Sequence, residues 1–365
     1  MQEIDDLLRI SMAEGVGALL FRRLMARFGD PKAVLTAPLR ALEEVEGMGP
    51  KTAAALHAAR AVDVGPIRRR AEALEVRIIS LSSPDFPVAL KSIYDPPIVL
   101  YVKGALLPTD LLAIAVVGAR RCSIYGQTQA ERIASGLARC GFTVVSGLAR
   151  GIDIAAHRGA LRAKGRTIAV LACGLGRVYP PEHKEMADRI AENGALISEL
   201  PLNAAPQREA FPARNRLVSG LSLGVLVVEA ARNSGSLITA RHAAEQGREV
   251  FALPGQVDSP LNRGSHALIK DGAKLVEDVD DIIKELGPLS RTVVAESGEA
   301  YDDPRLLSMN QKEAQVYSVL SSTPQAIDDI ITALRLPASE VSSTLTVLEI
   351  KRFVKQLSGK RFVRA

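Results

Sequence analysis

The chain has 365 residues, of which 47% are hydrophobic, so it is long enough for two or three domains with sizeable apolar cores. It has no run of 18 or more apolar residues and no basic-then-apolar start, which argues against a helical membrane span and a secretory signal. The three cysteines form no Cys-x-x-Cys motif, which disfavours a zinc site and favours the reducing cytoplasm, and the net charge of +5 permits an anionic partner without proving one.

Residues 1–65 are predicted to form a module of short helices, because apolar residues such as Leu20 and Leu24 recur at helical spacing. Residues 47–49 (Gly-Met-Gly) open an alanine-rich helix, and residues 15–17 (Gly-Val-Gly) are a candidate second copy. Such turns resemble a helix-hairpin-helix or SAM-like module, in which backbone N–H groups face a DNA phosphate. A plain helical packing module explains the same pattern, so both interpretations stay open.

Residues 66–286 are predicted to form a Rossmann-like, doubly wound α/β domain with a mostly parallel sheet. Short β-branched runs alternate here with helical stretches, which is typical of a parallel sheet covered by helices on both faces. The predicted strands are residues 113–117, 143–145, 167–171, 196–198, 225–229 and 249–252. The predicted helices between them are residues 127–139, 154–163, 185–193 and 237–246.

Residues 287–309 lack periodicity and are predicted to be a linker. Residues 310–365 show three helical patterns, at 311–320, 327–334 and 339–350, and then two alternating runs around Ser358 and Gly359. Three helices followed by a hairpin predict a winged-helix-like module.

The third helix of this module carries two glutamates and no Lys or Arg, so the phosphates that line a major groove would repel it. We therefore predict that residues 310–365 do not bind duplex DNA specifically. The basic residues at its end and in the hairpin contact protein, touch a strand weakly, or form a solvated face. They are Lys351, Arg352, Lys355, Lys360, Arg361 and Arg364.

Four glycine-containing segments follow predicted strands of the α/β domain, at residues 117–121, 146–153, 173–177 and 230–236. Ligands of this fold bind beyond the carboxyl ends of the strands, where glycine lets the backbone approach closely. The loops would present N–H donors with arginines beside them, which suits phosphates. The dinucleotide fingerprint and the P-loop motif are both absent, so the phosphates of a polymer are expected. Because only 4% of the residues are aromatic, those phosphates must carry most of the affinity for a strand.

A further cluster places Arg214 and Arg216 on either side of Asn215, just before an apolar helical stretch. The guanidinium fork of arginine suits phosphate oxygens. The alternative is a structural role, in which the two arginines pair with Glu209 or Glu229 inside the fold, and the sequence does not decide between them.

The sequence contains little that indicates a catalytic site. The five histidines show neither H-E-x-x-H nor regular ligand spacing, and residues 234–236 (Ser-Gly-Ser) are not G-x-S-x-G. Asp153 and His157 lie four residues apart and are interpreted as a structural hydrogen bond rather than an acid–base pair. Glu199 and Glu229 follow strands and allow a carboxylate pair, although two structural roles are favoured.

Nine segments in chain order resemble the DNA-processing protein A family (DprA/Smf). Each is weak alone, whereas the ordered set across residues 84–280 is highly specific. They are residues 116–120 (VVGAR), 146–153 (SGLARGID) with His157, 167–171 (TIAVL), 179–182 (YPPE), 198–201 (SELP), 211–216 (FPARNR) with 219–222 (SGLS), 228–230 (VEA), 234–240 (SGSLITA) and 254–255 (PG).

The resemblance implies an accessory protein of natural transformation and recombination, which binds and protects incoming single-stranded DNA and helps to load the RecA recombinase. It implies a homodimer and no cofactor, metal, membrane or catalytic reaction. The expected DNA-binding residues are Gly118, Arg120, Ser146, Gly147, Arg150, Gly151, Gly174, Lys184, Arg214, Asn215, Arg216, Ser234, Gly235 and Ser236.

This chain departs from the family pattern at four positions. Ala119 stands where the family often has serine, Ala172 and Gly176 replace a glycine and an aspartate, and His183 stands where asparagine is common. Two alternative functions stay open. A Rossmann-like nucleoside-phosphate hydrolase would carry a Pro-Gly-Gly-x-Gly-Thr loop and a following glutamate, which residues 233–236 do not reproduce. A protein-binding scaffold would act through the two end modules.

Overall fold

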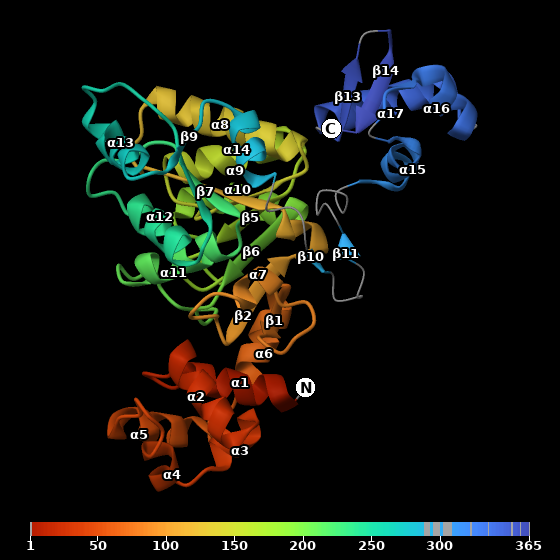
Figure 1. The fold of residues 1–365 in the computed structure, drawn as a ribbon. Coiled ribbons are helices and arrows are strands. Elements are labelled where there is room, and N and C mark those ends of the chain that lie inside the picture. Colours follow the sequence, from red (N-terminus) through yellow and green to blue (C-terminus); the bar gives the residue numbers. More distant parts are fainter. Residues whose placement is uncertain are drawn as a thin grey trace.

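The computed structural model describes residues 2–287, 293–294, 300–301, 309–321, 323–334, 336–351, 353–357 and 359–364. These residues form an N-terminal helical module, a nine-stranded α/β domain and a C-terminal winged helix (Figure 1). The predicted linker lies mostly outside the described residues. Its described part contains a short antiparallel pair of strands, β10 (Val293–Val294) and β11 (Ala300–Tyr301).

The N-terminal module consists of α1 (Gln2–Met12), α2 (Ala18–Phe28), α3 (Pro31–Thr36), α4 (Leu39–Glu43), α5 (Pro50–Ala59) and α6 (Gly65–Ala73). Its two glycine turns have matching backbones. Gly15 and Gly47 both have a φ of 85°, in the left-handed region that favours glycine. Gly17 and Gly49 then lead in extended conformation into α2 and α5. The turn at residues 15–17 is thus a second copy of the turn at 47–49, and DNA contact at either turn stays a prediction.

The sheet of the α/β domain has the strand order β1-β2-β6-β5-β4-β3-β7-β8-β9. Its strands are β1 (Val76–Ser80), β2 (Val99–Gly104), β3 (Ala113–Val117), β4 (Thr143–Ser146), β5 (Thr167–Val170), β6 (Gly194–Ser198), β7 (Gly224–Val227), β8 (Glu249–Ala252) and β9 (Lys274–Leu275). Strands from β6 to β9 pair in parallel, and β1 and β2 extend one edge in antiparallel pairing. The six predicted strands are confirmed as β3 to β8, whereas β1, β2 and β9 were not predicted.

Helices cover both faces of this sheet, as the continuous apolar run of β3 requires. They are α7 (Val88–Lys91), α8 (Ile124–Arg139), α9 (Ile152–Arg162), α10 (Lys184–Asn193), α11 (Ala210–Gly220), α12 (Ser236–Glu245), α13 (Arg263–Lys270) and α14 (Val279–Leu286), with the 3-10 turns η1 (Pro108–Leu111), η2 (Pro181–His183) and η3 (Pro260–Asn262). Ile114 and Val116 of β3 pack with α8, α9 and α14, while Ala115 and Val117 pack with α11 and α12. The doubly wound, mostly parallel fold is therefore confirmed.

The C-terminal residues form a winged helix with its own apolar core, which includes Val316, Leu345 and Phe353. Its elements are α15 (Gln311–Val319), β12 (Gln325–Ala326), α16 (Ile327–Leu334), α17 (Ala338–Ile350), β13 (Val354–Leu357) and β14 (Arg361–Arg364). β14 pairs with both β12 and β13 in antiparallel fashion. The predicted helices and hairpin are confirmed, and β12 is an addition to them.

Candidate nucleic-acid interface

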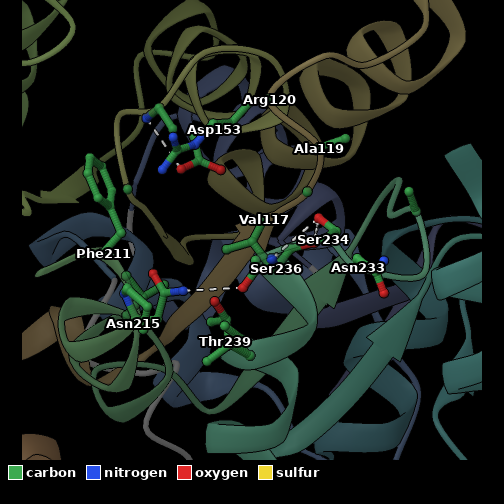
Figure 2. A pocket seen from close by; sticks show the side chains of 18 of the residues that line it. Val117, Ala119, Arg120, Asp153, Phe211, Asn215, Asn233, Ser234, Ser236 and Thr239 are labelled. Carbon is green, nitrogen blue, oxygen red and sulfur yellow. Dashed lines mark hydrogen bonds between the residues drawn. The ribbon is translucent and has the colours of Figure 1, made fainter. Parts of the chain in front are cut away.

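A pocket of about 430 Å³ lies beyond the carboxyl ends of β3, β4 and β7 (Figure 2). The strand order reverses here, because β4 to β6 lie on one side of β3 and β7 to β9 on the other. Three of the four predicted loops line it, at residues 117–121, 147–153 and 231–236, together with α11 and the start of α12. The fourth loop lines a small adjoining hollow through Cys173.

The loop after β7 brings the N-terminus of α12 to the pocket wall. Gly235 precedes the helix and is exposed, and the Ser236 N–H donates to Ser234 Oγ at a long 3.4 Å. The Oγ atoms of Ser234 and Ser236 are 2.8 Å apart, and Asn215 Nδ2 donates to the Gly235 carbonyl oxygen at 3.3 Å. Because the first N–H groups of a helix carry partial positive charge, this wall suits a phosphate.

Two exposed cations line the pocket, Arg120 and Arg121. The guanidinium carbon of Arg120 lies 4.4 Å from the ring centroid of Phe211, and Figure 2 shows these two side chains near each other beside Asp153. A cation over an aromatic face is attracted by the electron density of the ring. Among the described residues Arg120 forms no ion pair, so its charge remains available to an anionic ligand.

Arg214 lines the same pocket but is only 5% exposed. Its Nη1 donates to the Val170 carbonyl oxygen, and its Nε has no hydrogen-bond partner among the described residues. Burial lowers the pKa of this guanidinium, while the neighbouring Asp153 carboxylate raises it. A Cβ on Gly147 would lie 2.0 Å from Nη1, so glycine makes room for the arginine. Arg214 therefore shapes the pocket from behind.

Arg216 does not line the pocket, although it was predicted to bind DNA. Its Nε donates to Asp95 at 2.6 Å, and its Nη1 and Nη2 donate to Glu199 at 3.0 and 2.6 Å. Arg216 therefore has the structural role that was the alternative to phosphate binding. Its carboxylate partners are Glu199 and Asp95, whereas the sequence suggested Glu209 or Glu229. A doubly paired guanidinium is not free for phosphate.

Arg150 and Lys184 are exposed and form surface ion pairs. Arg150 Nε lies 2.6 Å from Glu182, and Lys184 Nζ lies 2.9 Å from Asp188. Exposed pairs contribute little, so a phosphate can replace either carboxylate. Arg150 lines the small adjoining hollow, whereas Lys184 lines neither space.

The remaining predicted residues have structural roles. Ser146 is fully buried and its Oγ donates to the Val116 carbonyl oxygen at 2.7 Å, so its hydroxyl does not reach a ligand. A Cβ on Gly118 would lie 2.5 Å from a side chain of α9, and a Cβ on Gly174 would lie 2.0 Å from a backbone oxygen. These glycines, like Gly151, allow the loops to pack closely.

The Asp153–His157 hydrogen bond expected from the sequence is not present. Asp153 Oδ2 accepts the Ala149 N–H at 3.3 Å, while His157 Nδ1 lies 2.7 Å from Thr167 Oγ1. Since Thr167 Oγ1 donates to the Val144 carbonyl oxygen, it accepts from Nδ1–H, which leaves Nε2 unprotonated. His157 Nε2 has no partner among the described residues. The two side chains thus do not form an acid–base pair, because each is held by a different neighbour.

Glu199 and Glu229 serve separate structural partners. Glu229 accepts the Ser123 N–H at 2.7 Å and the Ser123 hydroxyl at 2.8 Å, which fixes the start of α8. Glu199 holds Arg216. The interpretation of two structural carboxylates is confirmed.

Buried His157 is expected to make folding sensitive to mild acid. Burial, with Arg214 and His183 nearby, lowers its pKa from 6.5 to about 3. The unfolded chain therefore takes up the proton first, so the folded state loses stability as the pH falls from 6.5 toward 3, by at most about 1.4 kcal/mol per pH unit. The variant His157→Asn keeps a donor for Thr167 without a titrating ring. Between about pH 7.5 and about pH 5, the wild type should lose roughly 2 kcal/mol more unfolding free energy than the variant. Equal losses in denaturant titrations would contradict this.

Sequence reasoning missed several lining residues. Thr239 lies one helical turn after Ser236, so helical spacing was the signal for it. Phe211 and Tyr179 lay in segments that carry the resemblance, and an aromatic ring beside an arginine was their signal. Leu261 comes from η3 beyond β8, and no polar motif marks it.

The described part of the chain offers no group of three or more His, Cys, Asp or Glu side chains that suits a metal ion. None of the described helices combines the length and the apolar character that crossing a bilayer requires.

Comparison with known proteins places this pocket in context. The model of the family described as DNA recombination-mediator protein A matches residues 77–287, and the model of the DprA winged helix domain matches residues 302–360. Protein Smf of Synechocystis sp. is 34% identical over an alignment of 386 positions, gaps included. The alignment covers 97% of each chain. DNA processing protein DprA of Bacillus subtilis is 46% identical over 212 residues, 58% of this chain and 71% of that one.

Two solved structures are similar as well. DNA processing protein A from Streptococcus pneumoniae has a TM-score of 0.69 and 34% identity, over 77% of this chain and 97% of that chain. DNA processing protein A from Helicobacter pylori has a TM-score of 0.53 and 31% identity, over 59% of this chain and 96% of that chain. The latter structure concerns the single-stranded DNA binding mode of that protein.

Proposed function

Because the chain belongs to the DNA-processing protein A family (DprA/Smf), we propose that it binds single-stranded DNA at the pocket of Figure 2. We further propose that it protects incoming DNA in transformation and helps a RecA recombinase to assemble on it. The observation that carries the binding proposal is one pocket lined both by an exposed arginine without an ion pair, Arg120, and by the N-terminus of α12. This pairing of donors suits a strand phosphate.

The contacts fall into two groups. Direct contacts are assigned to the Arg120 guanidinium, the Asn215 amide and residues 234–236, which all line the pocket. Arg150 and Lys184 supply exposed charge nearby. Arg214 and the loop glycines hold the pocket open from behind. Val117, Val218 and Ile238 give it apolar walls against which a base or sugar can pack.

The shape of the site favours a single strand over a duplex. A protein reads a duplex by placing a helix or a strand pair in a groove about 12 Å wide. Here the donors converge inside a concave pocket of about 430 Å³, which a strand enters only if its nucleotides are unpaired.

A homodimer is part of the proposal, because the family resemblance implies one. β9 forms one edge of the sheet, and its Leu275 is 41% exposed, which leaves an edge open to a second copy. Sedimentation equilibrium at micromolar protein should give the mass of two chains.

We infer a binding role rather than catalysis from how the carboxylates near the pocket are held. Asp153 is buried beneath Arg214 and accepts backbone N–H groups, while Glu229 is occupied by Ser123. A nucleoside-phosphate hydrolase would instead present a carboxylate free to act on the ligand. Phosphate or base release from nucleoside monophosphates would favour that alternative.

The RecA part of the proposal has its own test. Single-stranded DNA is first coated with single-strand-binding protein, and ATP hydrolysis by RecA is then followed with and without this protein. Shorter lag times are expected when it is present, together with slower digestion of the strand by an exonuclease. An unchanged lag with normal strand binding would remove RecA loading alone.

The winged helix is expected to bind duplex DNA only non-specifically, with the weak affinity typical of such binding. Its third helix, α17, exposes Ser342, Ser343 and Thr346, and it carries no Lys or Arg. In the hairpin, Arg364 lies over the Tyr317 ring at 4.5 Å. Residues 310–365 titrated with random duplex near physiological salt should show a Kd no tighter than about 10⁻⁶ M. Much tighter binding that discriminates among sequences would contradict the prediction.

A further inference from the structure

A second, smaller hollow of about 20 Å³ adjoins the main pocket. The two spaces share Arg120, Gly147, Ala149 and Phe211 as lining residues, so only the Arg120–Phe211 pair and a stretch of backbone separate them. The hollow is too small to admit a base. Its rim, however, continues the surface that a strand leaving the main pocket would follow.

An exposed aromatic ring stands on this rim. Tyr179 is 37% exposed, and its ring centroid lies 6.0 Å from that of Phe211 with an interplanar angle of 64°. Since Arg120 lies over the Phe211 ring and Tyr179 packs against the same ring, the three side chains are in contact in the order Arg120, Phe211 and Tyr179. In a chain with 6 tyrosines and 8 phenylalanines, two aromatic rings thus meet where the small hollow adjoins the main pocket.

A cation accompanies the ring. Arg150 lines the same hollow as Tyr179, and its side chain is 57% exposed. Its partner Glu182 is also exposed, at 49%, so a strand phosphate can displace the carboxylate. An aromatic platform with a basic group beside it is how proteins hold unpaired nucleotides without reading their sequence.

We propose that Tyr179 is the stacking platform for the base that follows the nucleotide in the main pocket, with Arg150 on the adjoining phosphate. The inference rests on the proposed single-strand function and adds a base contact to a site otherwise built for phosphates. The proposal gives the path of the strand over the protein surface. The strand runs from the N-terminus of α12, across the Arg120–Phe211 pair, toward η2.

Two strands of equal length separate base stacking from backbone contact. One is an ordinary oligonucleotide, and the other carries abasic sugar-phosphates throughout. Base stacking is worth about 1–3 kcal/mol for each base, so Tyr179→Ala should bind the ordinary strand about 5- to 140-fold more weakly than the wild type does. Its affinity for the abasic strand should be unchanged. Tyr179→Phe keeps the ring and should bind both strands as the wild type does.

Tyr94→Ala is the matched control, because Tyr94 is a 69% exposed tyrosine that lines neither space. It should bind both strands normally, and unfolding midpoints confirm that every variant is folded. Unchanged binding of the ordinary strand by Tyr179→Ala would overturn the proposal. An equal loss on the abasic strand would overturn it too, because the ring would then position backbone contacts only. Failure of the wild type to bind any single strand would instead refute the proposed function itself, and the subsite with it.

Discussion

Replacing Arg120 with alanine is expected to weaken single-stranded DNA binding about 10- to 100-fold. A hydrogen bond to a charged group contributes about 1.5–3 kcal/mol, and each 1.4 kcal/mol corresponds to a factor of ten. Arg120 is one of two exposed arginines that line the pocket, and its described contact is an aromatic ring, so its removal breaks no ion pair. Loss of one phosphate contact should also reduce the slope of log K against log salt by about 0.7.

The measurement is a salt series of fluorescence titrations with a labelled single strand. Arg77→Ala is the control, because it removes the same charge from β1, where Arg77 pairs with Asp85 far from the pocket in the fold. The control should keep both the wild-type affinity and the wild-type slope. If folded Arg120→Ala protein also keeps both, Arg120 does not contact phosphate.

Replacing Gly151 with alanine is expected to cost between about 2 and 6 kcal/mol of unfolding free energy. Gly151 has φ 79° and ψ −121°, a conformation that only glycine adopts without strain of about 1–3 kcal/mol. A Cβ there would also lie 2.2 Å from the Ala119 carbonyl oxygen, and overpacking costs about 1–3 kcal/mol more. The loops after β3 and β4 would have to separate, so DNA binding should fall as well.

Gly235→Ala is the matched variant, since Gly235 precedes α12 as Gly151 precedes α9. Its φ is −63° and no atom lies within 4 Å of its added Cβ, so its stability should change by no more than about 1 kcal/mol. Denaturant unfolding of both variants tests the pair. Wild-type stability in Gly151→Ala would show that this backbone is not required.

The strands that the sequence predicts correctly are those with a clear local pattern of apolar residues. The strands that it misses depend on pairing with segments far away in the sequence, or are too short to show a pattern. β3 is a run of five apolar residues followed by a helical pattern, and its type and bounds were predictable. β1 and β2 pair with each other and with β6 in antiparallel fashion, which the alternation of strands and helices does not indicate. β9 has two residues, too few to show any period.

The site was predictable in position but less so in its side-chain roles. The rule that ligands bind at the carboxyl ends of strands brought three loops together correctly. Arg216 has two carboxylate partners, and the sequence indicated neither, because Asp95 is 121 positions away in the chain and Glu199 is 17 positions away on a different loop. Ser146 belongs to the buried end of β4, where its hydroxyl satisfies a neighbouring strand instead of a ligand.

The most direct test of the central claim compares one labelled oligonucleotide, single-stranded and as its duplex, with full-length protein at about 50 mM and about 200 mM salt. The proposed pocket predicts tighter binding of the single strand at both concentrations, and weaker binding of it as salt rises. Equal or tighter binding of the duplex at the same salt would contradict a site built for unpaired nucleotides.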